Sequence, residues 1–273
     1  MPSQFLLEFS TLYSSIHGWL SLAVCSLGLI LNILNVIILK RTRTESSSKT
    51  SLILVSLAIS DSCTMLTYIP YAVYYYIIYS NSILLEPFPK RDNIASTIFS
   101  VIHLDLSLTF HCISIWLTVY LAFYRYIYMS KSVDSIRKRR NHNNNSQNSF
   151  KTKQKIVRYL LSKCKHTIWL ICVFSIVICM PVYFYPSIKQ SLYINQTQQT
   201  KENQTIGPVF IYYISSSKLD KLTDGLVYKA MFYSQALFGK ILPCILLILF
   251  ITLLVHSLVI WIYFYFYMCS NYL

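Results

Sequence analysis

The feature that most constrains this chain is a series of five apolar stretches, each long enough to cross a lipid bilayer. A helix needs about 20 mainly apolar residues to cross the hydrocarbon core. The stretches lie at about residues 16–39, 51–79, 94–129, 166–186 and 226–263. Because a single apolar segment satisfies its backbone polar groups in lipid only as a helix, these lengths predict an all-α membrane protein with a helical transmembrane bundle.

The basic residues gather just outside apolar stretches. The net charge is +14, yet only 12% of the residues are charged. Lys and Arg concentrate between Lys40 and Lys49 and between Lys131 and Lys165. A surplus of this size could suit nucleic-acid binding, but its position follows the positive-inside pattern of multi-pass membrane proteins. We therefore expect a plasma-membrane protein with its N-terminus outside, the lipid bilayer as a partner and no nucleic acid.

Three segments flank or interrupt the bundle. Residues 1–15 are expected to form an extracellular tail, and residues 264–273 an atypical C-terminal tail. Residues 131–165 are basic and of low complexity, which predicts a disordered cytoplasmic insertion with affinity for anionic lipid. The N-terminus lacks the basic region of a cleavable signal peptide, so the first span should serve as its own insertion signal.

The segment of residues 187–224 is polar and is assigned to the outside, as is the segment of residues 81–93. It carries two N-glycosylation sequons, at Asn195 and Asn203. Their position agrees with the orientation that the basic segments indicate. Glycosylation of both asparagines is expected.

The third stretch carries a polar stripe through an otherwise apolar span. Residues three or four apart share one face of a helix, and a stripe in lipid must face other helices or water. The stripe consists of Ser107, His111, Ser114, Thr118 and Arg125. The opposite face carries Leu108, Phe110, Ile113, Leu117 and Tyr120. This pattern predicts that the other spans pack around the third one.

Isolated polar residues in other parts of the spans call for partners. Asp61 lies near mid-bilayer, where a carboxylate costs about 3 kcal/mol and needs a cation, a proton or hydrogen bonds. Lys240, one turn before Pro243, is expected to be buried and to need an acceptor. Asp105, at the outer end of the third span, is a candidate contact for a cationic ligand group; a solvated boundary residue is the alternative.

No pattern of an enzyme or a metal site is found. The histidines do not cluster at metal-ligand spacing, and the chain has no phosphate-binding glycine loop. The eight cysteines lie in or beside the spans, which favours packing over a disulfide framework. We therefore expect a protein that is not an enzyme and holds no metal cofactor.

The spaced marks resemble the rhodopsin-like (class A) G-protein-coupled receptors. These marks are Asn32, the run from Leu57 to Asp61, Arg125-Tyr126, Trp169 and Pro243. Within that class the chain is most similar to invertebrate FMRFamide- and myosuppressin-type neuropeptide receptors. Three segments carry this finer resemblance: Tyr68 to Tyr71, Ser114 to Ala122, and Lys240 to Leu247. The resemblance covers about residues 28–254.

The resemblance implies roles for the matching residues. Asn32, Asp61 and Ser114 would belong to a pocket for a sodium ion and to activation, and Arg125 and Tyr126 would meet a heterotrimeric G protein. Pro70, Pro243 and Trp169 would be structural, with kinks at the prolines. The ligand would be an extracellular peptide with a basic residue. Its expected contacts are His103, Asp105, Ser107, His111 and Lys240. A receptor dimer is a further expected partner.

The chain departs from this resemblance in three ways. Tyr124 replaces the acidic residue that usually precedes the switch arginine. The expected cysteine at the top of the third span is absent, with Ser100 nearby, and so is its partner in the outer loop, which should loosen that loop. Five spans are present where the family has seven, which suggests a form truncated after the fifth helix and without autonomous signalling.

Two other functions stay open. A truncated, non-signalling isoform could modulate a full-length receptor and retain it in the endoplasmic reticulum. A transporter or channel could use Asp61, Arg125 and Lys240 to line a path, but this reading needs an internal repeat or broken helices, and no repeat is found.

Overall fold

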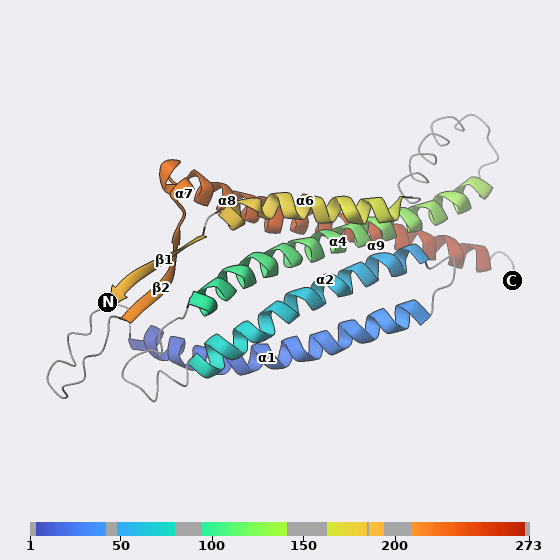
Figure 1. Ribbon diagram of the computed structural model, residues 1–273. Coiled ribbons are helices and arrows are strands. Elements are labelled where there is room, and N and C mark those ends of the chain that lie inside the picture. Colours follow the sequence, from blue (N-terminus) through green and yellow to red (C-terminus); the bar gives the residue numbers. More distant parts are fainter. Residues whose placement is uncertain are drawn as a thin grey trace, which may run out of the picture. The chain divides into compact units, whose positions relative to one another are not determined.

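The computed structural model describes residues 4–41, 48–79, 94–140, 163–184, 186–193 and 209–270 (Figure 1). Most of these residues are helical. The helices and strands, in chain order, are α1 (Gln4–Arg41), α2 (Ser48–Ala72), η1 (Val73–Tyr79), α4 (Ile94–Arg140), α6 (Cys164–Phe184), β1 (Pro186–Tyr193), β2 (Val209–Ser216), α7 (Lys218–Leu222), α8 (Leu226–Ala236), η4 (Leu237–Ile241) and α9 (Leu242–Ser270).

Five helical segments of the described chain are long and apolar enough to cross a membrane. They are Ile16–Arg41, Lys49–Ile77, Ile94–Lys131, Cys164–Phe184 and Leu226–Tyr263. This result confirms the predicted class, a predominantly helical membrane protein with five candidate spans. The η1 and η4 segments are π-helical. η1 continues α2 without a break, and η4 leads directly into α9.

Helices extend into three segments that the sequence marks as tails or as an insertion, and the predicted disorder of the basic insertion is wrong for residues 131–140. α1 begins at Gln4 inside the expected tail of residues 1–15, α4 continues to Arg140, and α9 continues to Ser270. The added stretches contain neither glycine nor proline, so a helix nucleated in the span propagates through them at little cost. The rest of the basic insertion, residues 141–162, lies outside the described residues.

The segment after α6 contains a β-hairpin that the sequence did not predict. Its strands β1 and β2 pair antiparallel, from Pro186 opposite Ser216 to Tyr193 opposite Val209. The strands lie side by side and lead into α7 (Figure 1). β2 is rich in β-branched and aromatic residues, which favour an extended, paired backbone. Sixteen residues of this segment are therefore paired, and the expectation that the missing disulfide loosens the segment stays a prediction.

The chain divides into two compact units, which are described separately. The first unit comprises Met1–Asn32, Asp61–Phe110 and Cys179–Tyr233. The second comprises Ile33–Ser60, His111–Ile178 and Ser234–Leu273.

In the first unit, two glycines let α1 approach its neighbour. A Cβ atom at Gly18 would lie 2.5 Å from the Tyr76 Cβ atom, and one at Gly28 would lie 2.6 Å from the Met65 Cε atom. The Asn32 amide donates a hydrogen bond to the Met65 sulfur at 3.9 Å. Small residues permit close packing of membrane helices, so these glycines fix where α1 meets the following helical segments.

The start of α8, also in the first unit, is held by the buried side chain of Asp220. Its carboxylate accepts a hydrogen bond from the Tyr228 amide at 2.9 Å. The turn before α8 contains Asp224 at φ 49° and Gly225 at φ 76°. Both residue types tolerate this left-handed conformation better than others do. α7 and α8 are therefore joined by a defined turn.

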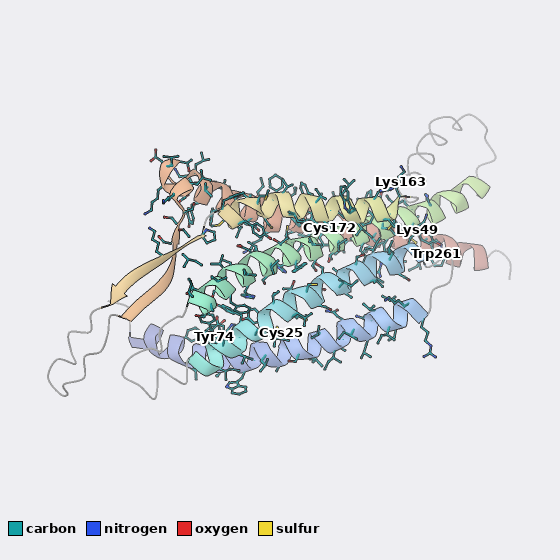
Figure 2. The ribbon with its side chains drawn as sticks, viewed as in Figure 1. Cys25, Lys49, Tyr74, Lys163, Cys172 and Trp261 are labelled. Carbon is teal, nitrogen blue, oxygen red and sulfur yellow. The ribbon has the colours of Figure 1, made fainter. Side chains whose placement is uncertain are left out.

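In the second unit, the buried side chains of Ile53, Tyr124 and Cys164 form the core of a hydrophobic cluster. Tyr124 is only 8% exposed. A carboxylate at this position would lose its hydration, whereas the tyrosine ring packs against the apolar cluster. Lys49 and Lys163 lie beside this region, at the starts of α2 and α6 (Figure 2).

The span of α4 is the most buried of the five. In its most apolar 18-residue stretch 39% is buried, whereas the value is 22% or less in each of the other spans. The prediction that α4 lies at the centre of the packing agrees with this burial. The predicted polar stripe, however, does not form one buried face. Ser114 is buried, but His111 is exposed, and Ile113 and Leu117 of the opposite face are buried as well. Neighbours thus cover α4 on more than one side.

Candidate ligand-binding site

In the first unit, α4 carries two buried polar side chains that lack partners for specific atoms. His103 and Asp105 are each 7% exposed. Among the described residues, the His103 Nδ1 atom and the Asp105 Oδ1 atom have no hydrogen-bond partner. Buried polar atoms are normally satisfied, so each exception calls for an explanation. These two atoms mark two candidate ligand contacts on α4.

His103 lies in a cluster of aromatic rings. Its ring stacks on Tyr71 at 4.4 Å between centroids and 18° between planes. The rings of Tyr68 and Phe99 follow at 5.6 Å and 6.4 Å. Tyr68 in turn hydrogen-bonds His17 of α1 at 3.2 Å. Residues from three helical segments therefore hold the imidazole in place.

Asp105 lies beside a hydrogen-bonded group that links α4 to α6. The Thr109 hydroxyl donates to the Asp105 carbonyl oxygen at 2.8 Å and pairs with the Tyr183 hydroxyl at 2.7 Å. The carboxylate itself takes no part in these bonds. Its Oδ1 atom is an acceptor in a buried place, which suits a cationic or strongly donating group.

The other predicted ligand contacts differ in burial and in the unit to which they belong. Ser107 is half-buried in the first unit. His111 and Lys240 belong to the second unit and are exposed. The expectation that Lys240 is buried is therefore wrong. Lys240 lies in the π-helical segment η4, where its side chain is turned to the surface of the described chain.

The residues implied for sodium binding and coupling are divided between the units. Asn32 and the half-buried Asp61 belong to the first, and Ser114 to the second. Their joint role stays a prediction. In the second unit Arg125 is exposed and Tyr126 is half-buried. Asn195 and Asn203 lie outside the described residues.

The residues named as structural have different environments. Pro243 is buried, whereas Pro70 is exposed and Trp169 is 64% exposed. Pro70 lies inside α2, three residues before η1, and Pro243 follows η4 closely. Each proline is thus accompanied by π-helical backbone, a known way of absorbing a proline within a helix.

Trp116, in the segment from Ser114 to Ala122, donates a hydrogen bond to a backbone carbonyl of η4. In a π-helical turn residue i+5 donates to residue i, as the Leu242 amide does to Leu237. The next donor to Phe238 would be Pro243, which has no N–H. The Trp116 indole supplies the missing bond, donating to the Phe238 carbonyl at 3.1 Å. Trp116 also packs edge-to-face on Phe174.

The tyrosines and threonine that position the site were also missed as site residues. Tyr71, Thr109 and Tyr183 are distant in sequence but meet α4 or belong to it. Tyr71 stood in the segment that carried the family resemblance, but no contact was predicted for it or for Tyr183. Hydrophobic periodicity gives no signal for such pairings.

Comparison with known proteins agrees with this architecture. Residues 19–260 match the family described as "Serpentine type 7TM GPCR chemoreceptor Srw". The "G-protein coupled receptor dmsr-1" of Caenorhabditis elegans is 26% identical over 252 residues, which are 90% of this chain and 43% of that protein. The chain spans less than half the length of this relative. Because the family match covers most of the chain, this protein belongs to the serpentine seven-transmembrane G-protein-coupled chemoreceptor family Srw.

Proposed function

We propose that this protein binds an extracellular FMRFamide-like neuropeptide and that the Asp105 carboxylate contacts a basic group of that peptide. The observation that carries the proposal is the buried Oδ1 atom of Asp105, which has no partner among the described residues. An uncompensated buried carboxylate is costly, so its presence favours a cationic partner that arrives with the ligand.

A binding measurement tests this contact directly. Labelled Phe-Met-Arg-Phe-amide is bound to membranes from cells that express the chain, alongside an analogue whose arginine is replaced by neutral citrulline. We expect the arginine peptide to bind at least tenfold more tightly, and Asp105→Asn to remove this preference, because a buried charge pair contributes more than one neutral hydrogen bond.

Asp224→Asn is the matched control. It makes the same change of charge at an exposed turn residue whose positive φ asparagine tolerates. The control should keep the arginine preference. If Asp105→Asn keeps the preference as well, Asp105 does not meet the basic group.

The remaining roles form part of the same proposal. The chain would lie in the plasma membrane with its N-terminus outside, would couple to a G protein through Arg125 and Tyr126, and would bind sodium at Asp61 with Asn32 and Ser114. The hairpin and α7 would be extracellular. Orientation is tested by glycosidase digestion: the mobility shift should disappear when the asparagines at 195 and 203 are both changed to glutamine.

A second candidate function is modulation of a longer receptor by this chain. Two observations favour it. No residue is buried in the most apolar 18-residue stretch of α1, and only 6% of the corresponding stretch from α8 to α9 is buried. Lipid or another membrane protein must cover these surfaces. The test is co-expression with a full-length relative. Reduced surface display of that relative supports modulation, and unchanged display excludes it.

A further inference from the structure

The neighbours of the His103 ring indicate which of its two nitrogens carries the hydrogen. The backbone of Thr67 lies within interaction range of the ring. Thr67 lies inside α2, where its own N–H serves the helix, so the group that meets the ring is the carbonyl, an acceptor. The ring nitrogen that faces it must donate. In a neutral imidazole the other nitrogen, Nδ1, is then an acceptor, and this atom has no partner among the described residues.

Packing alone does not account for a histidine at this place. A phenylalanine ring could stack on Tyr71 in the same way and would bury no lone pair. The imidazole is held by rings on several sides, so Nδ1 does not gain from solvent either. A buried acceptor without a hydrogen-bond donor lowers the stability of the fold unless a ligand or another group supplies that donor.

We infer that His103 Nδ1 is a ligand contact that accepts a hydrogen bond from an N–H or O–H group carried beside an apolar or aromatic part of the ligand. The inference rests on the proposed function and deepens it. The chemistry excludes a carboxylate at this position, since both groups would be acceptors. The neighbouring faces of Tyr71 and Phe99 favour an apolar or aromatic body next to the donor.

This contact is separate from the one proposed for Asp105. Two residues along a helix are rotated by about 200°, so the side chains at 103 and 105 leave α4 in nearly opposite directions. His103 meets aromatic residues of α2, and Asp105 lies beside the Tyr183 link to α6. A ligand that satisfies both must therefore present two donors, one of them basic.

The first experiment needs no ligand. The full chain is purified with His103→Phe, and its thermal unfolding is compared with the unchanged protein. If Nδ1 has no structural partner, the variant loses only the interaction with the Thr67 backbone and removes an unsatisfied acceptor, so its unfolding midpoint should be equal or higher. A clearly lower midpoint overturns the inference, because His103 would then serve the fold, for example through an ordered water.

The second experiment uses Phe-Met-Arg-Phe-amide as the probe with two amide substitutions. His103→Gln places its amide near the position of Nε2 and lacks a group at Nδ1, whereas His103→Asn places an amide near Nδ1. We expect His103→Gln to weaken peptide binding about tenfold and His103→Asn to weaken it less. Equal binding by both variants overturns the inference. If the unchanged chain does not bind the peptide, the peptide proposal fails, and the unfolding experiment still decides the state of His103.

Discussion

The bond between the Trp116 indole and the Phe238 carbonyl gives a sharp prediction. Trp116→Phe keeps an aromatic ring against Phe174 but removes the donor to a carbonyl that Pro243 cannot serve. A buried backbone acceptor without a donor costs about 1–3 kcal/mol. For a chain of this size that corresponds to a midpoint lower by about 2–12 °C. Thermal unfolding of the purified chain in detergent measures the shift.

Two further variants distinguish the effect of losing this hydrogen bond from the effect of replacing any tryptophan. Trp169→Phe makes the same chemical change at a side chain that is 64% exposed, and it should shift the midpoint by less than about 2 °C. Pro243→Ala restores a backbone N–H that can donate to the Phe238 carbonyl in the π-helical turn. The cost of Trp116→Phe should therefore be smaller in the Pro243→Ala background.

The refuting result is additivity. If Trp116→Phe costs the same with and without Pro243→Ala, the indole bond does not replace the missing backbone donor, since independent sites give independent costs. An equal loss for Trp169→Phe would also refute the reasoning, because it would show that ring size alone decides the effect.

Three other predictions concern the first unit and can be checked by the same unfolding measurement. Gly18→Ala should cost about 1–3 kcal/mol because the new methyl group meets the base of a side chain, whereas Gly28→Ala should cost less because it meets the flexible end of a methionine. Asp220→Ala should cost about 0.5–2 kcal/mol, since the start of α8 loses a capping acceptor. Lys221 lowers the pKa of Lys189 below its ordinary 10.5, so the unfolded chain binds more protons between the lowered pKa and 10.5. Stability should therefore rise with pH across that window, and Lys221→Gln should flatten the rise; a slope that this substitution leaves unchanged would contradict the assignment.

Much of the fold could be predicted from the sequence because the length of an apolar segment is a local property. The predicted starts of two spans, at residues 94 and 226, coincide with Ile94 of α4 and Leu226 of α8. The prediction that the chain is not an enzyme is confirmed by its receptor family. The hairpin was missed because β1, with Ser, Lys and Gln in its interior, is too polar to be recognised as a strand without its partner β2.

The candidate site was predictable only in part. His103 and Asp105 could be named because polar residues within an apolar span are unusual. Their surroundings could not be named, since the contacts with Tyr71 and Tyr183 depend on how segments distant in sequence pack together. Lys240 was misplaced for a similar reason: its burial was expected from its place in an apolar span, but which face of a span meets other helices depends on tertiary packing.

The π-helical turn in η4 has a consequence for comparing related sequences. Such a turn holds about one residue more than an α-helical turn, so the face presented after Ile241 is rotated by about 100° relative to an uninterrupted helix. A helical wheel drawn over the whole of residues 226–270 will therefore mix lipid-facing and inward-facing positions. In a relative without this turn, the correct alignment should place a one-residue gap between Leu237 and Ile241, and a substitution scan should show two phases that meet there.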